Sequence, residues 1–407
     1  MFYGIIAAIV VLFSGPAFAL TMEEAVTAGL KNNPELQAFR LEEDAAKGQI
    51  EKAELPPFSN PVIEGGLSFQ DRAPGEEGGR FLNNQISISQ SVEVGGQREM
   101  RIAAATHNLA RVRMEIRNLM RNLTADIKDR FAQVLFLRDK EVLAKEFVLL
   151  QEELSRLVAS KYEAGEVAAL EVNLNQVELA RAKRDLVAVS TAYQSALLSL
   201  EALIGMASDA AVVPEGALAG ELPRLPDRET LLSRLPARSD LKAAEAEKLR
   251  SEAALALAER EAIPNVTWSL FQARDEQRYN RGGTISVEIP LFDRKKAELA
   301  EARIRASQTR IREAGTTRNA RTEIEESYAA AVSSLKELDL LKQAILGRTA
   351  ENLDLLQFAF REGKISFYDV RIAQRETIET RNSYLDALLS AQRAYNALER
   401  AAGGDLR

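Results

Sequence analysis

Most of this chain carries its apolar residues at helical spacing. The stretch 97–162 contains neither proline nor glycine, and leucine and valine recur in it every seven positions. At 1.5 Å per residue, a helix of about 65 residues would span roughly 100 Å. Two neighbouring heptad rows indicate packing against two partner helices, as in a closed ring of helices. The rows are Leu135, Val142 and Leu149 on one side, and Leu143, Leu150, Leu154 and Leu157 on the other.

The same periodicity predicts further helices along the chain. A helical stretch over 20–55 contains a break at Asn32-Asn33-Pro34, because the residue before a proline disfavours helical backbone. A second very long helix is expected over 295–360, with Leu346, Leu353 and Phe360 seven residues apart. The remaining predicted helices are 167–204, 228–262 and 365–398.

Before each long helix the apolar period shortens to two, which is typical of strands. One face carries Val, Ile, Leu or Trp, and the other carries Ser, Thr or Glu. Polar loops over 72–80 and 274–283 separate the two strands of each pair. Four strands of roughly ten residues at most are therefore expected. Their apolar positions include Ile86, Ile88, Val92 and Val94 in the first pair, and Val266, Trp268, Leu270, Ile285, Val287 and Ile289 in the second.

This order of elements occurs twice. Lys161–Gln176 and Ala359–Gln374 align at one constant offset, which pairs Gly165 with Gly363 and Gln176 with Gln374. Each copy joins a long helix to a return helix through a turn centred on glycine, where we expect positive φ. The chain is thus predicted to be a tandem duplication of helical hairpins. The expected parts are a signal peptide (1–19), a first repeat (20–207), a linker (208–227), a second repeat (228–403) and a tail (404–407).

Composition and the N-terminus narrow the function classes. The chain has no cysteine, which excludes disulfides and thiolate metal sites. Its net charge of -7 disfavours a nucleic-acid partner. An apolar run over 5–13 followed by Ala17-Phe18-Ala19 predicts a signal peptide cleaved near Ala19, with a buried N-terminal helix as the alternative. The run is too short for a transmembrane helix.

The strand pattern has a consequence for assembly. Ten residues suffice for a tilted strand to cross a bilayer, and an apolar outer face with a polar inner face is typical of a barrel wall around water. Four strands cannot close a barrel, and a membrane forbids open sheet edges. Several copies would each have to contribute four strands, and three copies give twelve. The alternative is a soluble sheet that caps a coiled coil.

The element order and several short motifs resemble the TolC family of outer-membrane efflux channels, over essentially all of residues 20–403. Within that family, SNPVIEGG (Ser59–Gly66) and QSVEVGGQR (Gln90–Arg98) resemble the branch that serves cobalt-zinc-cadmium and copper efflux pumps. The motifs that carry the family resemblance are Asn33-Pro34-Glu35-Leu36, Tyr162-x-x-Gly165, Phe360-x-x-Gly363, Ile289-Pro290-Leu291-Phe292 and the helix over 391–398.

The resemblance implies a mainly α fold with a small membrane β-barrel. Long helical hairpins from three copies would form an α-barrel, and four β-strands per chain would form a twelve-stranded barrel. It implies a homotrimer in the outer membrane lipid of a Gram-negative bacterium, with a long periplasmic extension. The partners it implies are a periplasmic adaptor (membrane fusion) protein and an inner-membrane transporter of the resistance-nodulation-division type.

The resemblance also implies two sets of site residues. The helix tips would dock onto the adaptor, although several members have Val-Gly-Leu where this chain has Ala164-Gly165-Glu166 and Glu362-Gly363-Lys364. Asp369 matches the first of two aspartates that close the tunnel of the best-known members, whereas Ile372 replaces the second.

Two roles stay open for Asp369. It lies six residues after the tip glycine, about 9 Å up the return helix. Three such carboxylates on an axis would attract cations, and their crowding would raise their pKa values as a coupled set. Glu171 is the matching residue of the first repeat and would widen that ring or face solvent. The alternative is that Asp369 is a helix-start carboxylate favoured by the helix dipole.

Catalytic chemistry finds no support in the sequence, so we expect no enzyme, no cofactor and no metal site. The only histidine, His107, lies inside the long helix and is expected to be a packing or surface residue. The acidic clusters have no spacing typical of metal ligands.

Three functions fit the sequence. The first is the passive exit duct of a tripartite efflux pump that exports metal cations or small toxic compounds. The second is the outer-membrane channel of a type I protein-secretion system. The third is a soluble periplasmic coiled-coil scaffold without a pore.

Overall fold

The computed structural model describes residues 18–71, 80–206, 212–218, 224–275, 278–346 and 358–406. The predicted loop over 72–80, except Arg80, the apolar run over 5–13 and Leu353 lie outside these residues. The described helices are α1 (Met22–Asn32), α2 (Pro34–Ala53), α3 (Gln97–Glu163), α4 (Ala169–Ile204), α5 (Arg228–Ser233), a 3-10 turn (Leu235–Ala237), α6 (Ser239–Glu261), α7 (Lys296–Leu346) and α9 (Phe367–Ala402). The described strands are β1 (Phe18–Leu20), β2 (Val62–Gln70), β3 (Phe81–Val92), β4 (Val212–Pro214), β5 (Val266–Asp275) and β6 (Arg278–Val287).

These elements form two compact units, and each unit combines pieces of both sequence repeats. The hairpin unit comprises Met1–Ala38, Asn118–Leu235 and Ala320–Arg407. The sheet unit comprises Phe39–Arg117 and Pro236–Asn319. The long helices α3 and α7 contribute residues to both units. The duplication seen in the sequence is thus interleaved in space.

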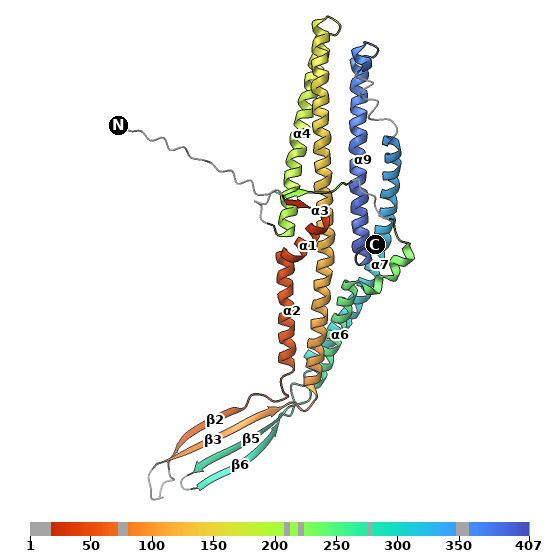
Figure 1. Cartoon of the computed structure of the whole chain (residues 1–407). Helices are drawn as coiled ribbons and strands as arrows, with labels where there is room; N and C mark the ends of the chain where they lie inside the picture. The colour runs from red at the N-terminus through yellow and green to blue at the C-terminus, as the bar shows by residue number, and fades with distance from the viewer. Residues whose placement is uncertain are drawn as a thin grey trace, which may run out of the picture. The chain divides into compact units, whose positions relative to one another are not determined.

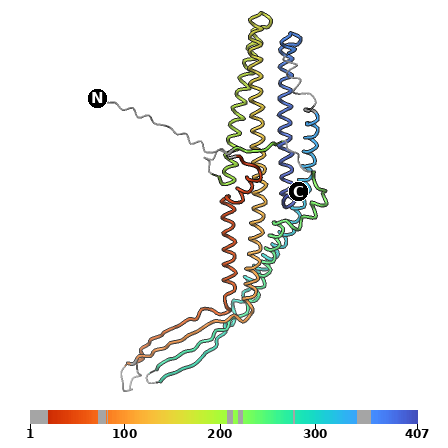
Figure 2. The backbone as a smooth tube through the Cα atoms, in the orientation of Figure 1, coloured from red at the N-terminus to blue at the C-terminus, as the bar shows by residue number. Residues whose placement is uncertain are grey.

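In the hairpin unit, α3 and α4 run side by side and form one hairpin (Figures 1 and 2). The polar side of α3 also bonds to α9 of the second repeat at several levels. A buried amide pair, Gln151 and Gln374, is joined by a 3.0 Å hydrogen bond. Lys140 and Asp386 form an ion pair at 3.0 Å. The two repeats are therefore held together by their long helices.

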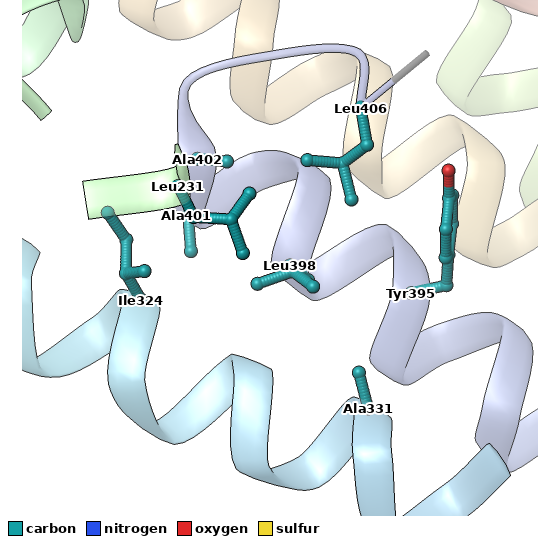
Figure 3. Packing of buried hydrophobic residues seen from close by; sticks show 8 residues of the cluster. All are labelled: Leu231, Ile324, Ala331, Tyr395, Leu398, Ala401, Ala402 and Leu406. Carbon is teal, nitrogen blue, oxygen red and sulfur yellow. The ribbon is translucent and has the colours of Figure 1, made fainter. Parts of the chain in front are cut away.

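One apolar core of the hairpin unit gathers α5, α7, α9 and the C-terminal residues (Figure 3). Leu231, Ile324 and Leu398 are each fully buried there. The predicted tail takes part, because Leu406 is 7% exposed and packs in the same cluster. Burial of each such side chain contributes about 1.5–3 kcal/mol before the entropy of ordering is subtracted.

In the sheet unit, the strands form one antiparallel sheet in the order β2-β3-β5-β6 (Figure 1). Each strand therefore runs opposite to its neighbour, and β2 and β6 are the two edges. The first predicted pair of strands is confirmed as β2 and β3. However, β3 has 12 residues and ends at Val92, so Val94 lies outside it.

Two sequence predictions are wrong in detail. The loop predicted over 274–283 is mostly strand, because β5 continues to Asp275 and β6 begins at Arg278. Pairing between β5 and β6 holds these polar residues in the sheet, which local composition does not reveal. The helix predicted over 228–262 breaks at the Leu235–Ala237 turn, which contains Pro236. The linker over 208–227 stays a prediction, and the short strand β4 within it pairs in parallel with β1.

Candidate functional site

The register of the sheet places most apolar residues of the four strands on one face, whereas Val62 and Phe271 lie on the other. Ile63 is opposite Ile88, and Ile88 is opposite Leu270. Side chains directly opposite each other share a face, so every second rung belongs to the same side. The apolar face carries Ile63, Leu67, Phe69, Leu82, Ile86, Ile88, Val92, Val266, Trp268, Leu270, Tyr279, Ile285 and Val287, and the other face carries mainly Ser, Thr, Asn and Gln. The predicted alternation is therefore confirmed.

The apolar face of the sheet has no cover within the described chain. Leu67 is 75% exposed and Ile285 is 77% exposed, and all of β2 is exposed. Soluble monomers rarely expose an apolar patch of this extent, so it marks a membrane or an interaction surface. Trp268 lies on this face between Gln90 and Ile285 and is half-buried. The polar face suits water.

The two helix tips share one backbone geometry. Gly165 has φ 76° and Gly363 has φ 71°, which confirms the predicted positive φ. After the glycine, Glu166 donates its N–H to Lys161, and Lys364 donates to Ala359, both at 2.8 Å. This is the Schellman helix ending, which satisfies carbonyls that the helix leaves free. The tip residues Ala164, Gly165, Glu166, Glu362, Gly363 and Lys364 are all exposed.

A buried apolar cluster joins the two tips. Val158 of α3 and Val370 of α9 are fully buried in it, and the Phe360 and Phe367 rings lie 6.4 Å apart. The Lys161 ammonium lies 5.6 Å from the centre of the Phe360 ring. The two tips therefore present one connected surface. The cluster contains Leu154, Val158, Phe360, Phe367 and Val370.

Asp369 takes part in the N-terminal cap of α9. Its Oδ2 atom accepts hydrogen bonds from the Ser366 hydroxyl at 2.7 Å and the Ser366 N–H at 2.9 Å. Asp369 in turn donates its own N–H to the Ser366 hydroxyl, which completes a capping box. These hydrogen bonds from Ser366 lower the pKa of Asp369. The structure thus shows the helix-start role that the sequence left open. Ser-x-x-Asp was a readable signal for it.

Glu171 has no such role in α4. The backbone at Ala168 matches that at Ser366, but alanine offers no side-chain oxygen and the cap hydrogen bond is missing. Glu171 is half-buried, and its Oε2 atom has no hydrogen-bond partner among the described residues. The structure therefore does not bring Glu171 and Asp369 into equivalent environments.

The two heptad rows of α3 have different neighbours. Leu143 and Leu154 are 8% and 2% exposed, whereas Val142 and Leu149 are 49% and 61% exposed. Leu135, which belongs to the same row as Val142 and Leu149, is only 3% exposed, so within that row Val142 and Leu149 alone are left without cover in the described chain. Among the described residues, α4 alone is long and apolar enough to cross a bilayer by composition, and only 17% of that stretch is buried. Its apolar residues similarly need a partner or lipid.

The described residues contain no arrangement of side chains typical of a metal site or of a catalytic site. They contain no group of three or more His, Asp or Glu that could hold a metal. His107 is half-buried within α3. The sheet unit has a cavity of about 770 Å³ with several cations in its wall, among them Arg101 and Arg111. Arg101 pairs with Glu93 at 2.7 Å, and Arg111 pairs with Glu115 at 2.6 Å. Ion pairs that remain this accessible to solvent contribute about 0–1 kcal/mol each.

Comparison with known proteins agrees with this geometry. The chain is 26% identical over 393 residues to the cobalt-zinc-cadmium resistance protein CzcC of Cupriavidus metallidurans, which covers 94% of this chain and 90% of that protein. It is 24% identical to the pyoverdine export outer membrane protein OpmQ of Pseudomonas aeruginosa, over 94% of this chain and 85% of that protein. The crystal structure of CusC shares the fold, with a TM-score of 0.79 at 17% identity over 96% of this chain and 94% of that one.

The model of the family described as outer membrane efflux protein matches residues 26–206 and 232–404. The two matched segments cover both sequence repeats. The uncovered apolar face of the sheet favours a membrane channel over the periplasmic scaffold that the sequence alone left open. This chain belongs to the outer membrane efflux protein family, and it is an outer-membrane efflux channel.

Proposed function

We propose that this channel is the exit duct of a tripartite pump that exports divalent transition-metal cations. The observation that supports the role as a duct is the four-stranded sheet, which has one apolar face and two open edges. Edges cannot remain open in a bilayer, so three copies close a twelve-stranded barrel. An adaptor and an inner-membrane transporter of the resistance-nodulation-division type supply the energy, since the described chain has no arrangement for catalysis.

The similarity to a cobalt-zinc-cadmium resistance protein supports the cargo. The similarity to a pyoverdine exporter supports a small organic cargo as the competing choice. A wide duct filled with water need not recognise what passes, so cargo is set by the pump to which the duct is coupled. Which cargo this channel exports therefore has to be decided from the phenotype of a strain that lacks it.

The test is deletion of the gene followed by growth on graded Co²⁺, Zn²⁺ and Cd²⁺, and in parallel on dyes and detergents. We expect tolerance to the metals to fall more than tolerance to the organic compounds, and a plasmid copy to restore it. Greater sensitivity to the organic compounds would contradict the metal cargo and favour a multidrug role. A purified protein that stays monomeric and soluble without detergent would contradict the duct itself.

The exposed tips are proposed to dock onto the adaptor. They form one connected surface, which supports a single docking site per chain. The charged residues at this surface include Glu166, Glu362 and Lys364, so the adaptor is expected to present charged or polar groups there.

Asp369 is proposed to line the periplasmic aperture in the trimer, in addition to its capping role. Its exposed carboxylate beside the tip supports this proposal. In single-channel recordings Asp369→Asn should reduce cation selectivity and weaken block by multivalent cations from the periplasmic side. Glu42→Gln, an exposed carboxylate on α2, should change neither. Unchanged selectivity and block in Asp369→Asn would leave the residue its capping role alone.

A further inference from the structure

The two strand-to-helix junctions differ by an insertion. The first repeat leaves its strand as Val92-Glu93-Val94 and enters α3 through Gly95-Gly96. The second leaves as Val287-Glu288-Ile289 and enters α7 through Arg294-Lys295. Between these equivalent parts, only the second repeat has the extra residues Pro290–Asp293. The inserted sequence, Pro-Leu-Phe-Asp, is strongly apolar for an exposed loop.

The first junction is packed inside the chain. A Cβ atom added to Gly95 would lie 3.0 Å from the Cβ atom of Ile263 and 3.0 Å from the carbonyl oxygen of Arg260. The Gln97 side chain donates hydrogen bonds at 3.3 Å to the Ile263 carbonyl and to Asn265. The β3–α3 junction is therefore seated on the segment that leads from α6 into β5.

The second junction has no such seat in the described chain. Leu291 is 65% exposed, and Phe292 is 100% exposed. The loop is nevertheless held in place, because Asp293 Oδ1 accepts the Lys295 N–H at 2.9 Å. Lys295 has φ 56° and is the one non-glycine residue of the described chain with positive φ, which costs about 1–2 kcal/mol. The turn that contains Lys295 is thus strained, and the Phe292 ring beside it is fully exposed.

The duplication identifies a segment of the first repeat that is equivalent to the one on which the β3–α3 junction packs. We call each of these two segments a seat. Ile263–Val266 leads from α6 into β5, and Leu55–Phe58 leads in the same way from α2 towards β2. Both segments have proline at the second position. The Leu55 carbonyl accepts a hydrogen bond from Arg98 and the Pro57 carbonyl accepts one from the Glu93 N–H, both within the chain. The side chains of Leu55 and Phe58 nevertheless remain 58% and 53% exposed in the described chain.

The seat at Leu55–Phe58 leads into the edge strand β2 and the insertion follows the edge strand β6, so closure of the proposed barrel brings these two edges of neighbouring copies together. Four alternating strands make β6 antiparallel to β2, so β6 of one copy continues onto β2 of the next with the same alternation. Val287 pairs with Val266, Val266 with Val92, and Val92 bridges to Phe58. Phe58 and Val287 therefore lie at one level on opposite edges of the sheet.

We propose that Leu291 and Phe292 pack on Leu55 and Phe58 of the next copy and form an apolar clasp at the base of the barrel. The clasp repeats between copies the contact that Gly95 and Ile263 make within the chain. Pro56, Pro57 and Pro290 lack an N–H donor, so beyond the strands the contact depends on side chains. This inference rests on the proposed trimeric barrel.

The absence of native cysteine makes the clasp testable by disulfide cross-linking in membranes. The variant with both Phe58→Cys and Phe292→Cys should form covalent dimers and trimers on mild oxidation, visible on non-reducing gels. Each single variant should form no ladder. The matched control pairs Phe292→Cys with Leu67→Cys, an exposed residue farther along the same edge strand, and should also form none.

A second measurement does not depend on introduced cysteines. Phe292→Ala should lower the temperature at which the detergent-extracted trimer dissociates, whereas Glu42→Gln, an exposed polar position on α2, should leave it unchanged. A trimer that forms without the Phe58–Phe292 cross-link would overturn the clasp and leave the channel intact, because Phe292 would then face lipid. A monomeric protein would overturn both the clasp and the trimeric channel.

Discussion

The two return helices begin with the same backbone and different side chains. Ala168, before α4, has φ -82° and ψ 154°, and Ser366, before α9, has φ -80° and ψ 161°. Only Ser366 supplies a capping oxygen, and only Asp369 closes a capping box with it. The duplication has therefore kept the fold of the turn while its local stabilisation now differs between repeats. The second return helix has the better-capped start, whereas the first tip is held by an ion pair between Lys161 and Glu166 at 2.7 Å.

The two return helices also differ farther from the tips, where the second again makes a contact that the first lacks. Gln374 of α9 is 1% exposed and bonds to Gln151, whereas its repeat equivalent Gln176 is exposed on α4. The second return helix packs against the partner repeat, and the first turns the equivalent residue outward. Equivalent positions in a duplicated chain therefore have different consequences when they are changed.

The largest effect is expected at the tip glycines. Gly165→Pro and Gly363→Pro force φ to about -65° where the turn has a positive φ. We expect both variants to reach the membrane as trimers and to lose export, which metal tolerance and trimer gels would measure. Gly48→Ala, at a helical position with open space around it, is the control and should retain export. Normal export in both proline variants would contradict docking at the tips.

A smaller loss is expected from the buried amide pair. Gln374→Ala leaves Gln151 buried without its partner and should destabilise the hairpin unit by about 1–3 kcal/mol. Gln176→Ala should change stability by less than about 0.5 kcal/mol, because the side chain is exposed. Denaturant titration of both variants would measure the difference. Equal losses of stability in the two variants would show that the different burial of Gln374 and Gln176 does not affect the free energy of unfolding.

Exchanging the caps should reverse the contrast between the tips. Ser366→Ala removes a capping oxygen and should destabilise the start of α9 by about 1 kcal/mol. Ala168→Ser places a serine three residues before Glu171, which is the pattern of a capping box, and should stabilise α4 by up to about 1 kcal/mol. Hydrogen exchange of the first-turn amides measures both. Faster exchange at α4 in Ala168→Ser would contradict the cap.

The smallest effect concerns pH. Because the Ser366 hydrogen bonds lower the pKa of Asp369 below its unfolded value of about 3.9, its contribution is complete above that value and is lost as pH falls through the lower folded pKa. A nitroxide label at Tyr368→Cys should therefore gain mobility in acid. The same label at Leu170→Cys, the equivalent exposed position of α4, should show no such change. If Asp369→Asn leaves the acid transition at Tyr368→Cys unaltered, the transition has another source.

Local order could be predicted from the sequence because it depends on neighbouring residues. The period of the apolar residues predicted the helices and the alternation of the strands. The glycines at the tips predicted positive φ, and Asn33-Pro34 predicted the break between α1 and α2. The repeat itself predicted that each half turns back on itself. The capping box of Ser366 and Asp369 was also present in the sequence, although only as one of two roles.

By itself the sequence determined the duplication, the helical hairpins and the amphipathic strands, since these follow from short-range spacing. Only the tertiary structure decided which residues meet. Register aligned the apolar faces of four strands and extended β5 and β6 through polar residues, because ladder hydrogen bonds outweigh local propensity. Packing decided that Gln374 is buried while Gln176 is exposed, and that the two sequence repeats interleave in both compact units. Such choices depend on contacts between residues far apart in the chain, which no local pattern contains.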